Sequence, residues 1–500
     1  MKHSGLLKAV GTVTLFSVFT RLLSFLFKIF LSRKVGAEVI GLYQIAVSVF
    51  YLFASIGCSG IPQVLSRRVA EDNALRTEKS GGLVSSALIL GGAFSLTTAV
   101  ACILLGDKLS FLFGDERALP LFLIMAPAIV STTIYSVIRA YFWGKKEFGY
   151  FSVTETVEEI FRIIFTAILV CNVFFYMDNR IAIAVAFTVS DIAVAVILTG
   201  LSIFKHGLPN RPSGLKDILL PSVPLTATRL MSGLSGTLMS IILPIALIKS
   251  GLSGSEATAK FGRITGMANP LLFAPNALIS SIAVVMIPEM SENGVLGNNT
   301  RLNGNLNKAI SFAIIISGMF VAVYSGAGSA LTKLLFDDSE SGYYLMIASL
   351  SMIPMGISSL ISSSLNSVGL ERASLVGFLT STAASFGIII GLSPLIREYS
   401  VAVASVVSSL VSVIVGSVAL YKKTGYTPKY LRTLACVLSF IIPSSCLAFS
   451  LNRILTPYLE GVAVIVAGGV AAILYIAFCM GFSLIDVKAL YVRQKSHSRS

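Results

Sequence analysis

The chain has 500 residues, of which 55% are hydrophobic and only 12% are charged, and its mean hydropathy is +0.85. A soluble protein of this length would need a charged shell around a chain that is roughly 45–50% apolar, so the composition excludes a soluble fold. The net charge of +14 falls in short islands, without a Lys/Arg stripe or interleaved aromatic residues. We therefore expect this charge to face an anionic membrane surface and not nucleic acid.

Apolar stretches of roughly 18 to 25 residues, long enough to cross the hydrocarbon core as helices, follow one another along the chain. The first seven predicted spans lie near 9–31, 39–61, 82–105, 119–141, 150–172, 181–204 and 217–247. The other seven lie near 264–288, 308–328, 343–365, 373–393, 400–421, 433–450 and 460–482. The sequence thus predicts an all-α integral membrane protein with about 14 transmembrane helices.

The loops between these spans alternate in charge. With the amino terminus inside, about twice as many Lys and Arg residues fall in the inner segments as in the outer loops, whereas the carboxylates divide almost evenly. Cytoplasmic loops carry such an excess of basic residues, which meets the anionic lipids of the inner leaflet. We therefore predict a multi-pass membrane protein with both termini cytoplasmic and with membrane lipids as partners.

Short sequence matches recur at equivalent places in the two halves of the chain. They are TRLLS at 20–24 and TRLMS at 228–232, Ile-Pro at 61–62 and 287–288, and a glycine at 144 and 369. Because six spans separate equivalent places, the halves keep one orientation and form a parallel repeat. The expected organisation is an N-terminal six-helix lobe at 1–216, a C-terminal six-helix lobe at 217–425, and two added helices with a cytoplasmic tail at 426–500.

Four basic residues are counted within the predicted spans, where a charge is costly and usually functional; three of them, apart from Arg162, are candidates for one site. Arg21 and Lys28 are seven residues apart and share one face of the first span, and Arg229 is the equivalent of Arg21 in the second lobe. If the lobes enclose a cleft, these cations form a substrate-binding site for an anionic head group such as a diphosphate. The alternative is that both arginines pair with buried carboxylates and that Lys28 reaches the outer surface.

Acidic residues concentrate in the fifth and sixth spans. Arg162 lies three and four positions after Glu159 and Glu158, so the three can form one stripe of structural ion pairs. The alternative is that Glu155 or Glu159, together with Asp191, binds a coupling cation or a proton. These five residues are therefore candidates for either ion coupling or structural pairing.

Six prolines lie in the seventh and eighth spans, at positions 221, 224, 244, 270, 275 and 288. Each removes a backbone hydrogen bond and bends its helix, so Pro221, Pro224, Pro244, Pro270 and Pro275 are candidate gating residues or ordinary kinks. The sequence has no zinc-protease, P-loop or nucleophile-elbow motif. We therefore predict no catalytic residues, metal or cofactor, and expect any transport energy to come from a coupling cation, the membrane potential or downstream consumption of the product.

A further signal comes from eight short segments, which are Arg21 to Gly36, Gly41-Leu42-Tyr43-Gln44, Gly60-Ile61-Pro62, 66–71, 139–144, 158–162, 266–275 and 288–292. Together these segments resemble the stage V sporulation protein B group of polysaccharide transporters. This group belongs to the multidrug/oligosaccharidyl-lipid/polysaccharide (MOP) exporter superfamily, which also contains the lipid II flippases. The resemblance implies a pair of six-helix lobes, alternating access, and cationic residues of the first helix, here Arg21 and Lys28, in the cleft.

The resemblance and the charges together predict a flippase, and not an enzyme, for an undecaprenyl-diphosphate-linked oligosaccharide used in peptidoglycan or surface polysaccharide. A cation-coupled multidrug exporter of the same superfamily (MATE-type) is the alternative, and its cleft would be acidic. A membrane enzyme or a scaffold for envelope assembly is the third interpretation.

Overall fold

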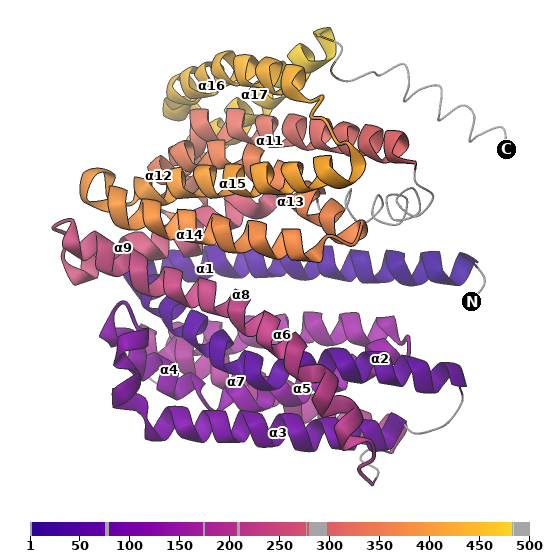
Figure 1. Cartoon of the computed structure of the whole chain (residues 1–500). Coiled ribbons are helices and arrows are strands. Elements are labelled where there is room, and N and C mark those ends of the chain that lie inside the picture. Colours follow the sequence, from indigo (N-terminus) through magenta and orange to yellow (C-terminus); the bar gives the residue numbers. More distant parts are fainter. Residues whose placement is uncertain are drawn as a thin grey trace. The chain divides into compact units, whose positions relative to one another are not determined.

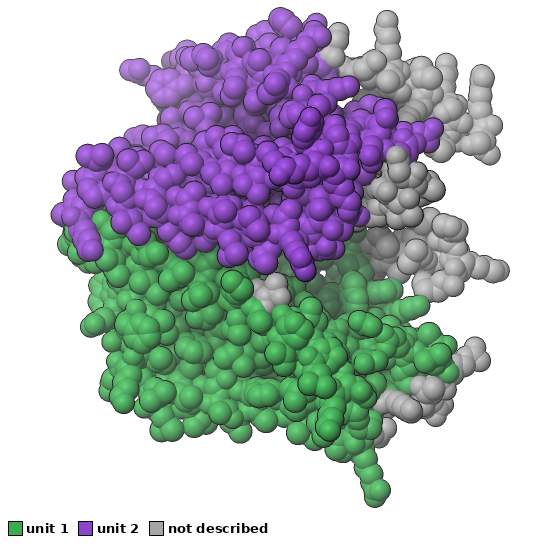
Figure 2. Space-filling model, in the orientation of Figure 1, with its two compact units in different colours: residues 1–248, 252–262 green, residues 249–251, 263–500 purple. Residues whose placement is uncertain are grey.

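The computed structural model describes residues 3–75, 80–173, 176–207, 211–276, 278–279, 298–482 and 484, with side chains described from residue 13 onward except at positions 206 and 228. These residues form helices joined by short links and contain no strand (Figure 1). By Cα packing the chain divides into two compact units, coloured separately in Figure 2. Unit 1 comprises 1–248 and 252–262, and unit 2 comprises 249–251 and 263–500.

Unit 1 begins with one long helix that a glycine divides. The helix α1 (His3–Cys58) is broken at Gly36, whose φ of 79° is a left-handed conformation that favours glycine. This break separates the first two predicted spans. The remaining elements of unit 1 are α2 (Gly60–Leu75), α3 (Ser80–Leu104), the 3₁₀ turns η1 (Gly106–Leu112) and η2 (Glu116–Ala118), α4 (Leu119–Met125), α5 (Ala128–Gly144), α6 (Phe148–Val170), α7 (Asn179–His206), α8 (Leu215–Lys249, as far as 248) and α9 (Gly254–Gly262).

The helix α5 occupies the middle of unit 1 and packs against α1, α2, α3, α6 and α7. A cluster of buried apolar side chains, among them Leu65, Val137 and Phe142, joins α2 to α5. A Cβ atom added at Gly144 would lie 2.6 Å from the Ser66 carbonyl oxygen, so this glycine lets α5 approach α2 closely. The contacts of α5 bring side chains of α2, α6 and α7 to one region of unit 1.

Unit 2 begins with a π-helical turn, η3 (Arg263–Ala268), and residues 269–276 continue it as α-helix. Its other described elements are α11 (Asn299–Phe336), α12 (Glu340–Ala348), η4 (Ser349–Ser351), α13 (Met352–Ser367), α14 (Glu371–Ile396), α15 (Tyr399–Thr424), α16 (Leu431–Leu459) and α17 (Gly461–Gly481). The helix α11 packs against α12, α13, α16 and α17, and α14 packs along α15. Unit 2 is thus centred on α11.

The all-helical membrane fold is confirmed, but the predicted number of spans is not. Among the described residues, 10 helices are long and apolar enough to cross a membrane, or 11 if α4 and α5, bent by 51°, count as one broken span. Residues 13–75 are counted as one membrane-spanning helix, although Gly36 breaks them into two. The helix α6 is not counted as a membrane span because it carries four charged residues. The last part of the predicted eighth span, residues 280–288, lies outside the described residues. So do the Ile287-Pro288 match and the C-terminal tail from residue 485.

The predicted lobes and the observed units rest on different criteria. The lobe boundary at 216/217 follows the repeat, whereas the units follow packing and divide at 262/263. The helix α8, which the repeat assigns to the second lobe, packs in unit 1, where the Thr226 hydroxyl accepts a hydrogen bond from the Gly60 N–H at 3.2 Å. The lobes at 1–216, 217–425 and 426–500 stay a prediction.

Candidate functional site

Arg162, on α6 in unit 1, is the centre of a buried network of charged side chains. Its Nη2 lies 2.7 Å from Glu158 Oε1 and 3.3 Å from Asp191 Oδ1, and its Nη1 lies 3.7 Å from Glu159 Oε2. The two glutamates lie one turn earlier on the same helix, as the spacing predicts, and Asp191 reaches the arginine from α7. Arg162 thus joins three of the four acidic residues that the sequence singled out.

A second arginine, Arg139 on α5, joins the network from the other side. Its Nη2 lies 3.6 Å from Glu155 Oε2, and its Nη1 lies 3.8 Å from Glu158 Oε2. Arg139 was not among the predicted site residues, because it lies at the inner end of the fourth predicted span, where the charge pattern places cytoplasmic basic residues. The available signal was that position 139 already lies inside the predicted span 119–141.

Uncharged side chains complete this network. The Thr132 hydroxyl donates to Asp191 Oδ2 at 2.7 Å, and the Tyr135 hydroxyl donates to Glu158 Oε1 at 3.2 Å. Removing such charges from water costs several kcal/mol per ion unless partners are in place. Two arginines face four carboxylates, so the network has an excess of negative charge when all of its members are ionised.

The first half of α1 lies along this network. The Thr20 and Thr156 hydroxyls are 2.9 Å apart and hydrogen-bond α1 to α6. Two turns further along α1, Lys28 is half-buried and interacts electrostatically with Glu159. Lys28 therefore offsets part of the negative charge of the network, and its predicted contact with an anionic substrate stays a prediction.

Arg21 and Arg229 differ from the buried arginines. Both side chains are exposed, and neither forms an ion pair with another described residue. Both belong to unit 1, Arg21 on α1 and Arg229 on α8. Within the described part of the chain no contact joins Arg229 to Arg21 or to Lys28, so the convergence of the three cations in one cleft stays a prediction.

The five candidate gating prolines lie in two helical segments. The helix α8 continues through Pro221, Pro224 and Pro244, and Pro270 and Pro275 lie in the helical residues 269–276 that follow the π-helical η3. Single-turn π-helices are frequent at functional sites, and each proline removes a backbone hydrogen bond. Their role in gating stays a prediction.

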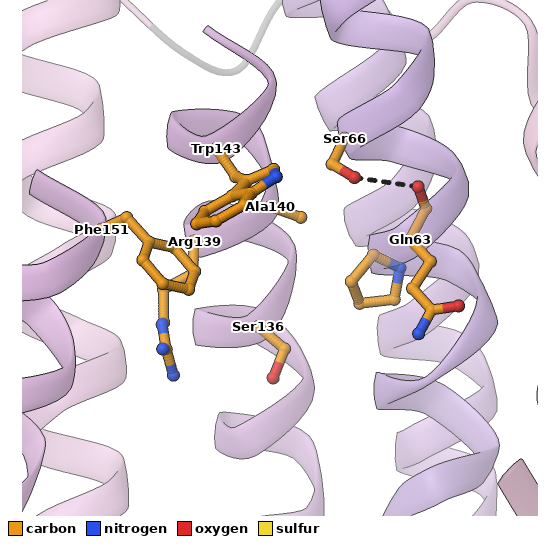
Figure 3. A pocket seen from close by; sticks show the side chains of 8 residues that line it. Gln63, Ser66, Ser136, Arg139, Ala140, Trp143 and Phe151 are labelled. Carbon is orange, nitrogen blue, oxygen red and sulfur yellow. Dashed lines mark hydrogen bonds between the residues drawn. The ribbon is translucent and has the colours of Figure 1, made fainter. Parts of the chain in front are cut away.

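A cavity of about 210 Å³ lies beside Arg139, between α2, α5 and α6. Figure 3 shows Ser136, Arg139, Ala140 and Trp143 on α5 and the α2 side chains on the opposite side. Its lining consists of Pro62, Gln63, Ser66, Ser136, Arg139, Ala140, Trp143 and Phe151. Polar and aromatic side chains thus converge where the ionic network meets a cavity.

This fold, with its many apolar helices and a buried ionic network in one unit, defines a multi-pass α-helical membrane protein. A model of the polysaccharide biosynthesis protein family matches residues 6–293, more than half of the chain. The chain therefore belongs to the polysaccharide biosynthesis protein family.

Its similarity to curated proteins covers about two thirds of each chain. It is 24% identical over 363 residues to stage V sporulation protein B of Bacillus subtilis (strain 168). The matched region makes up 69% of this chain and 68% of that protein. It is 23% identical over 373 residues to the lipid II flippase MurJ of the same organism. The matched region makes up 68% of this chain and 67% of that protein. The predicted kinship with the sporulation proteins and the lipid II flippases is confirmed.

Solved structures show the same fold. A structure of the lipid II flippase MurJ in an inward closed conformation matches with a TM-score of 0.74 and 14% identity, over 94% of this chain and 98% of that one. An inward-facing MATE family transporter of the MOP superfamily matches with a TM-score of 0.68 and 15% identity, over 82% of this chain and 96% of that one. The predicted MOP fold is confirmed.

Proposed function

We propose that this protein flips an undecaprenyl-diphosphate-linked oligosaccharide, a precursor of peptidoglycan or surface polysaccharide, from the inner to the outer leaflet of the bacterial cytoplasmic membrane by alternating access. Its membership of the polysaccharide biosynthesis family supports a lipid-linked saccharide as the substrate. The similarity to a lipid II flippase supports flipping as the activity.

The observation that carries this proposal is the contrast between paired and unpaired arginines in unit 1. Arg139 and Arg162 each have carboxylates within 4 Å, whereas Arg21 and Arg229 are exposed and have no ion-pair partner among the described residues. A cation in an apolar helix costs about 2.5–3.5 kcal/mol even on the most lenient insertion scale. Two such cations without protein partners are suited to an anionic ligand.

A diphosphate is the anion that fits these arginines best. The guanidinium group presents a planar fork of donors that binds phosphate oxygens with two parallel hydrogen bonds. Neutralising the diphosphate in this way lowers the cost of carrying it past the hydrocarbon core, whereas the uncharged saccharide needs only polar surroundings. The lipid chain stays in the bilayer throughout.

The negative excess of the buried network supports a role for a coupling cation or for the membrane potential. Four carboxylates share two arginines there, and Lys28 supplies a third positive charge nearby. A bound proton or alkali cation would balance the remaining charge. Release of that ion on the other side would then return the protein to its inward-facing state.

A cation-coupled multidrug exporter is the second candidate, and the same acidic excess favours it. Such a protein would place carboxylates and not arginines against its cationic substrate. The exposed Arg21 and Arg229 argue against this function, because they would repel a cationic drug.

The test is a flipping assay in liposomes with a fluorescent undecaprenyl-diphosphate-linked saccharide. We expect the double variant Arg21→Ala/Arg229→Ala to flip at least about tenfold more slowly, because hydrogen bonds to charged groups contribute about 1.5–3 kcal/mol each. The matched control is Arg180→Ala/Arg453→Ala, which removes two exposed arginines elsewhere. Unchanged flipping by the first variant, or drug export by the wild type without lipid flipping, would contradict the proposal.

A further inference from the structure

The cavity between α2, α5 and α6 contains hydrogen-bond donors that the protein itself leaves unused. Arg139 Nε is buried without a hydrogen-bond partner. The terminal nitrogens of Arg139 lie 3.6 and 3.8 Å from the Glu155 and Glu158 carboxylates, beyond the 2.7–3.2 Å of a normal hydrogen bond. Among the described residues the half-buried Ser136 hydroxyl and the exposed Trp143 indole N–H also have no hydrogen-bond partner. A buried donor such as Arg139 Nε is almost always satisfied, so the site lacks an acceptor that a ligand beside the Arg139 guanidinium would supply.

The aromatic side chains of the cavity provide a surface for an apolar face of that ligand. The Phe151 and Trp143 rings meet edge to face with centroids 4.7 Å apart, and Phe151 also lies 4.6 Å from Arg139 Cζ. Figure 3 shows Trp143 and Phe151 on the same side of the cavity as Arg139. Trp143 remains 43% exposed although it lies against two aromatic rings. Part of the indole is therefore available for contact with a ligand.

The charge around the cavity selects against an anion. Any anion that reached Arg139 would also approach the Glu155 and Glu158 carboxylates that already compensate it, and this repulsion would offset the attraction of the arginine. A cation in the cavity would meet the guanidinium of Arg139, the only charged side chain among the lining residues, and would be repelled by it. An uncharged ligand with many oxygen acceptors avoids both penalties.

The cavity is open on one side and has room for one small ring. Pockets for drug-sized ligands measure about 300–1,000 Å³, whereas this cavity measures about 210 Å³. Ala140 contributes to this space because its small side chain lies in the lining between Arg139 and Trp143. A longer side chain at position 140 would fill the cavity.

We propose that this cavity binds one pyranose ring of the transported saccharide, an inference that rests on the proposed function. The Arg139 guanidinium, the Ser136 hydroxyl and the Trp143 indole N–H donate to the hydroxyl and ring oxygens of the sugar, while Trp143 and Phe151 contact its C–H face. The cavity lies next to Arg67 and Lys145, which the charge distribution places in cytoplasmic loops. The sugar therefore enters this subsite from the cytoplasmic side.

The single tryptophan of the chain gives a direct test, because Trp143 is the only source of indole fluorescence. Detergent-purified protein is titrated with free N-acetylglucosamine, with glucose, with inorganic diphosphate and with glycerol. We expect a saturable change of emission for a saccharide, with a dissociation constant in the millimolar range as befits one ring. Glycerol and diphosphate should give no saturable change.

Three variants locate the binding site. Ser136→Ala should weaken saccharide binding a few-fold, and Ala140→Leu should abolish the saturable change. Ser439→Ala, which removes an exposed hydroxyl from α16 in unit 2, should bind as the wild type does. The Ser136→Ala and Ala140→Leu proteins are compared with the wild type by thermal unfolding, so a folding defect is recognised separately.

Two outcomes would overturn the saccharide subsite. One is a saturable response to diphosphate but not to sugars, and the other is a sugar response that Ala140→Leu leaves intact. The flipping assay separates this result from the proposed function. If the protein flips lipid but Trp143 shows no saccharide response, only the subsite proposal is contradicted. If Trp143 responds to saccharide but the protein does not flip lipid, the proposed function is contradicted. Repeating the titration with the lipid-linked saccharide distinguishes a transported head group from a free sugar.

Discussion

The two units of this protein accommodate buried polar groups in different ways. In unit 1 the helices α5, α6 and α7 bury arginines and carboxylates against one another. In unit 2 the helices around α11 use hydroxyl groups and small residues, as where the Tyr475 hydroxyl donates to the Ile315 carbonyl at 3.1 Å. The buried Ser393 and Ser400 hydroxyls, 2.9 Å apart, are another such pair.

This difference separates two kinds of vulnerability. An ionic network depends on the identity of every member, because the loss of one partner leaves an uncompensated charge. The stability of a small-residue interface in a membrane protein depends on side-chain volume, because small side chains let the helices approach closely and pack against each other. We therefore expect unit 1 to be sensitive to changes of charge and unit 2 to changes of size.

The largest effect should follow from Arg162→Met. The change keeps much of the side-chain volume but leaves Glu158 and Asp191 without their closest cation. Breaking a buried pair in this way costs about 3–5 kcal/mol, which we expect as a large fall in the thermal unfolding temperature in detergent. Arg180→Met is the control, because Arg180 pairs with Asp178 while both are more than 40% exposed, and such pairs contribute about 1 kcal/mol or less. Equal effects of the two variants would show that the network does not stabilise unit 1.

An intermediate effect should follow from Gly326→Val in unit 2. A Cβ atom at this position would lie 2.6 Å from Ala448 Cβ and would also overlap the Ser445 carbonyl oxygen, so α11 and α16 would have to separate. Overpacking of this kind costs about 1–3 kcal/mol. The same substitution at Gly387 on α14, where an added Cβ meets nothing within 4 Å, is the matched control. If both variants unfold at the temperature of the wild type, close packing of α11 on α16 does not stabilise unit 2.

The smallest effect concerns an ion pair of unit 1 outside the membrane-spanning helices. Burial raises the pKa of Asp115, but hydrogen bonds from Arg117 and from the Thr258 hydroxyl, the latter at 2.6 Å, outweigh it and leave this pKa below its ordinary value. A carboxylate with a lowered pKa in the folded protein stabilises it above the pKa of the unfolded chain, near 4, and this stability is lost as the pH falls through the folded pKa.

Asp115→Asn should therefore reduce stability at pH 7 by on the order of 1 kcal/mol and should flatten the decline of the unfolding temperature below about pH 4. The measurement is thermal unfolding across pH 7 to 3, with Asp107→Asn, a change of an exposed carboxylate, as the control. An unchanged acid slope in Asp115→Asn would show that Asp115 does not contribute to the acid sensitivity of unit 1.

Composition and spacing by themselves determined the membrane fold, because a chain this apolar must satisfy its backbone as helices in lipid. The spacing of Glu158, Glu159 and Arg162 also determined that they share one stripe of α6, since residues three and four apart are neighbours on any helix. The kinship with polysaccharide transporters was likewise visible in short segments such as Gly60-Ile61-Pro62.

Only the tertiary structure decided which residues from different helices meet. It brought Arg139 of α5 and Asp191 of α7 to the stripe on α6, and it packed α8, with Arg229, into unit 1. Helical periodicity fixes the face on which a side chain lies but not the neighbour that the face meets. That neighbour depends on how α2, α5, α6 and α7 pack around one another, and close packing at positions such as Gly144 sets those contacts.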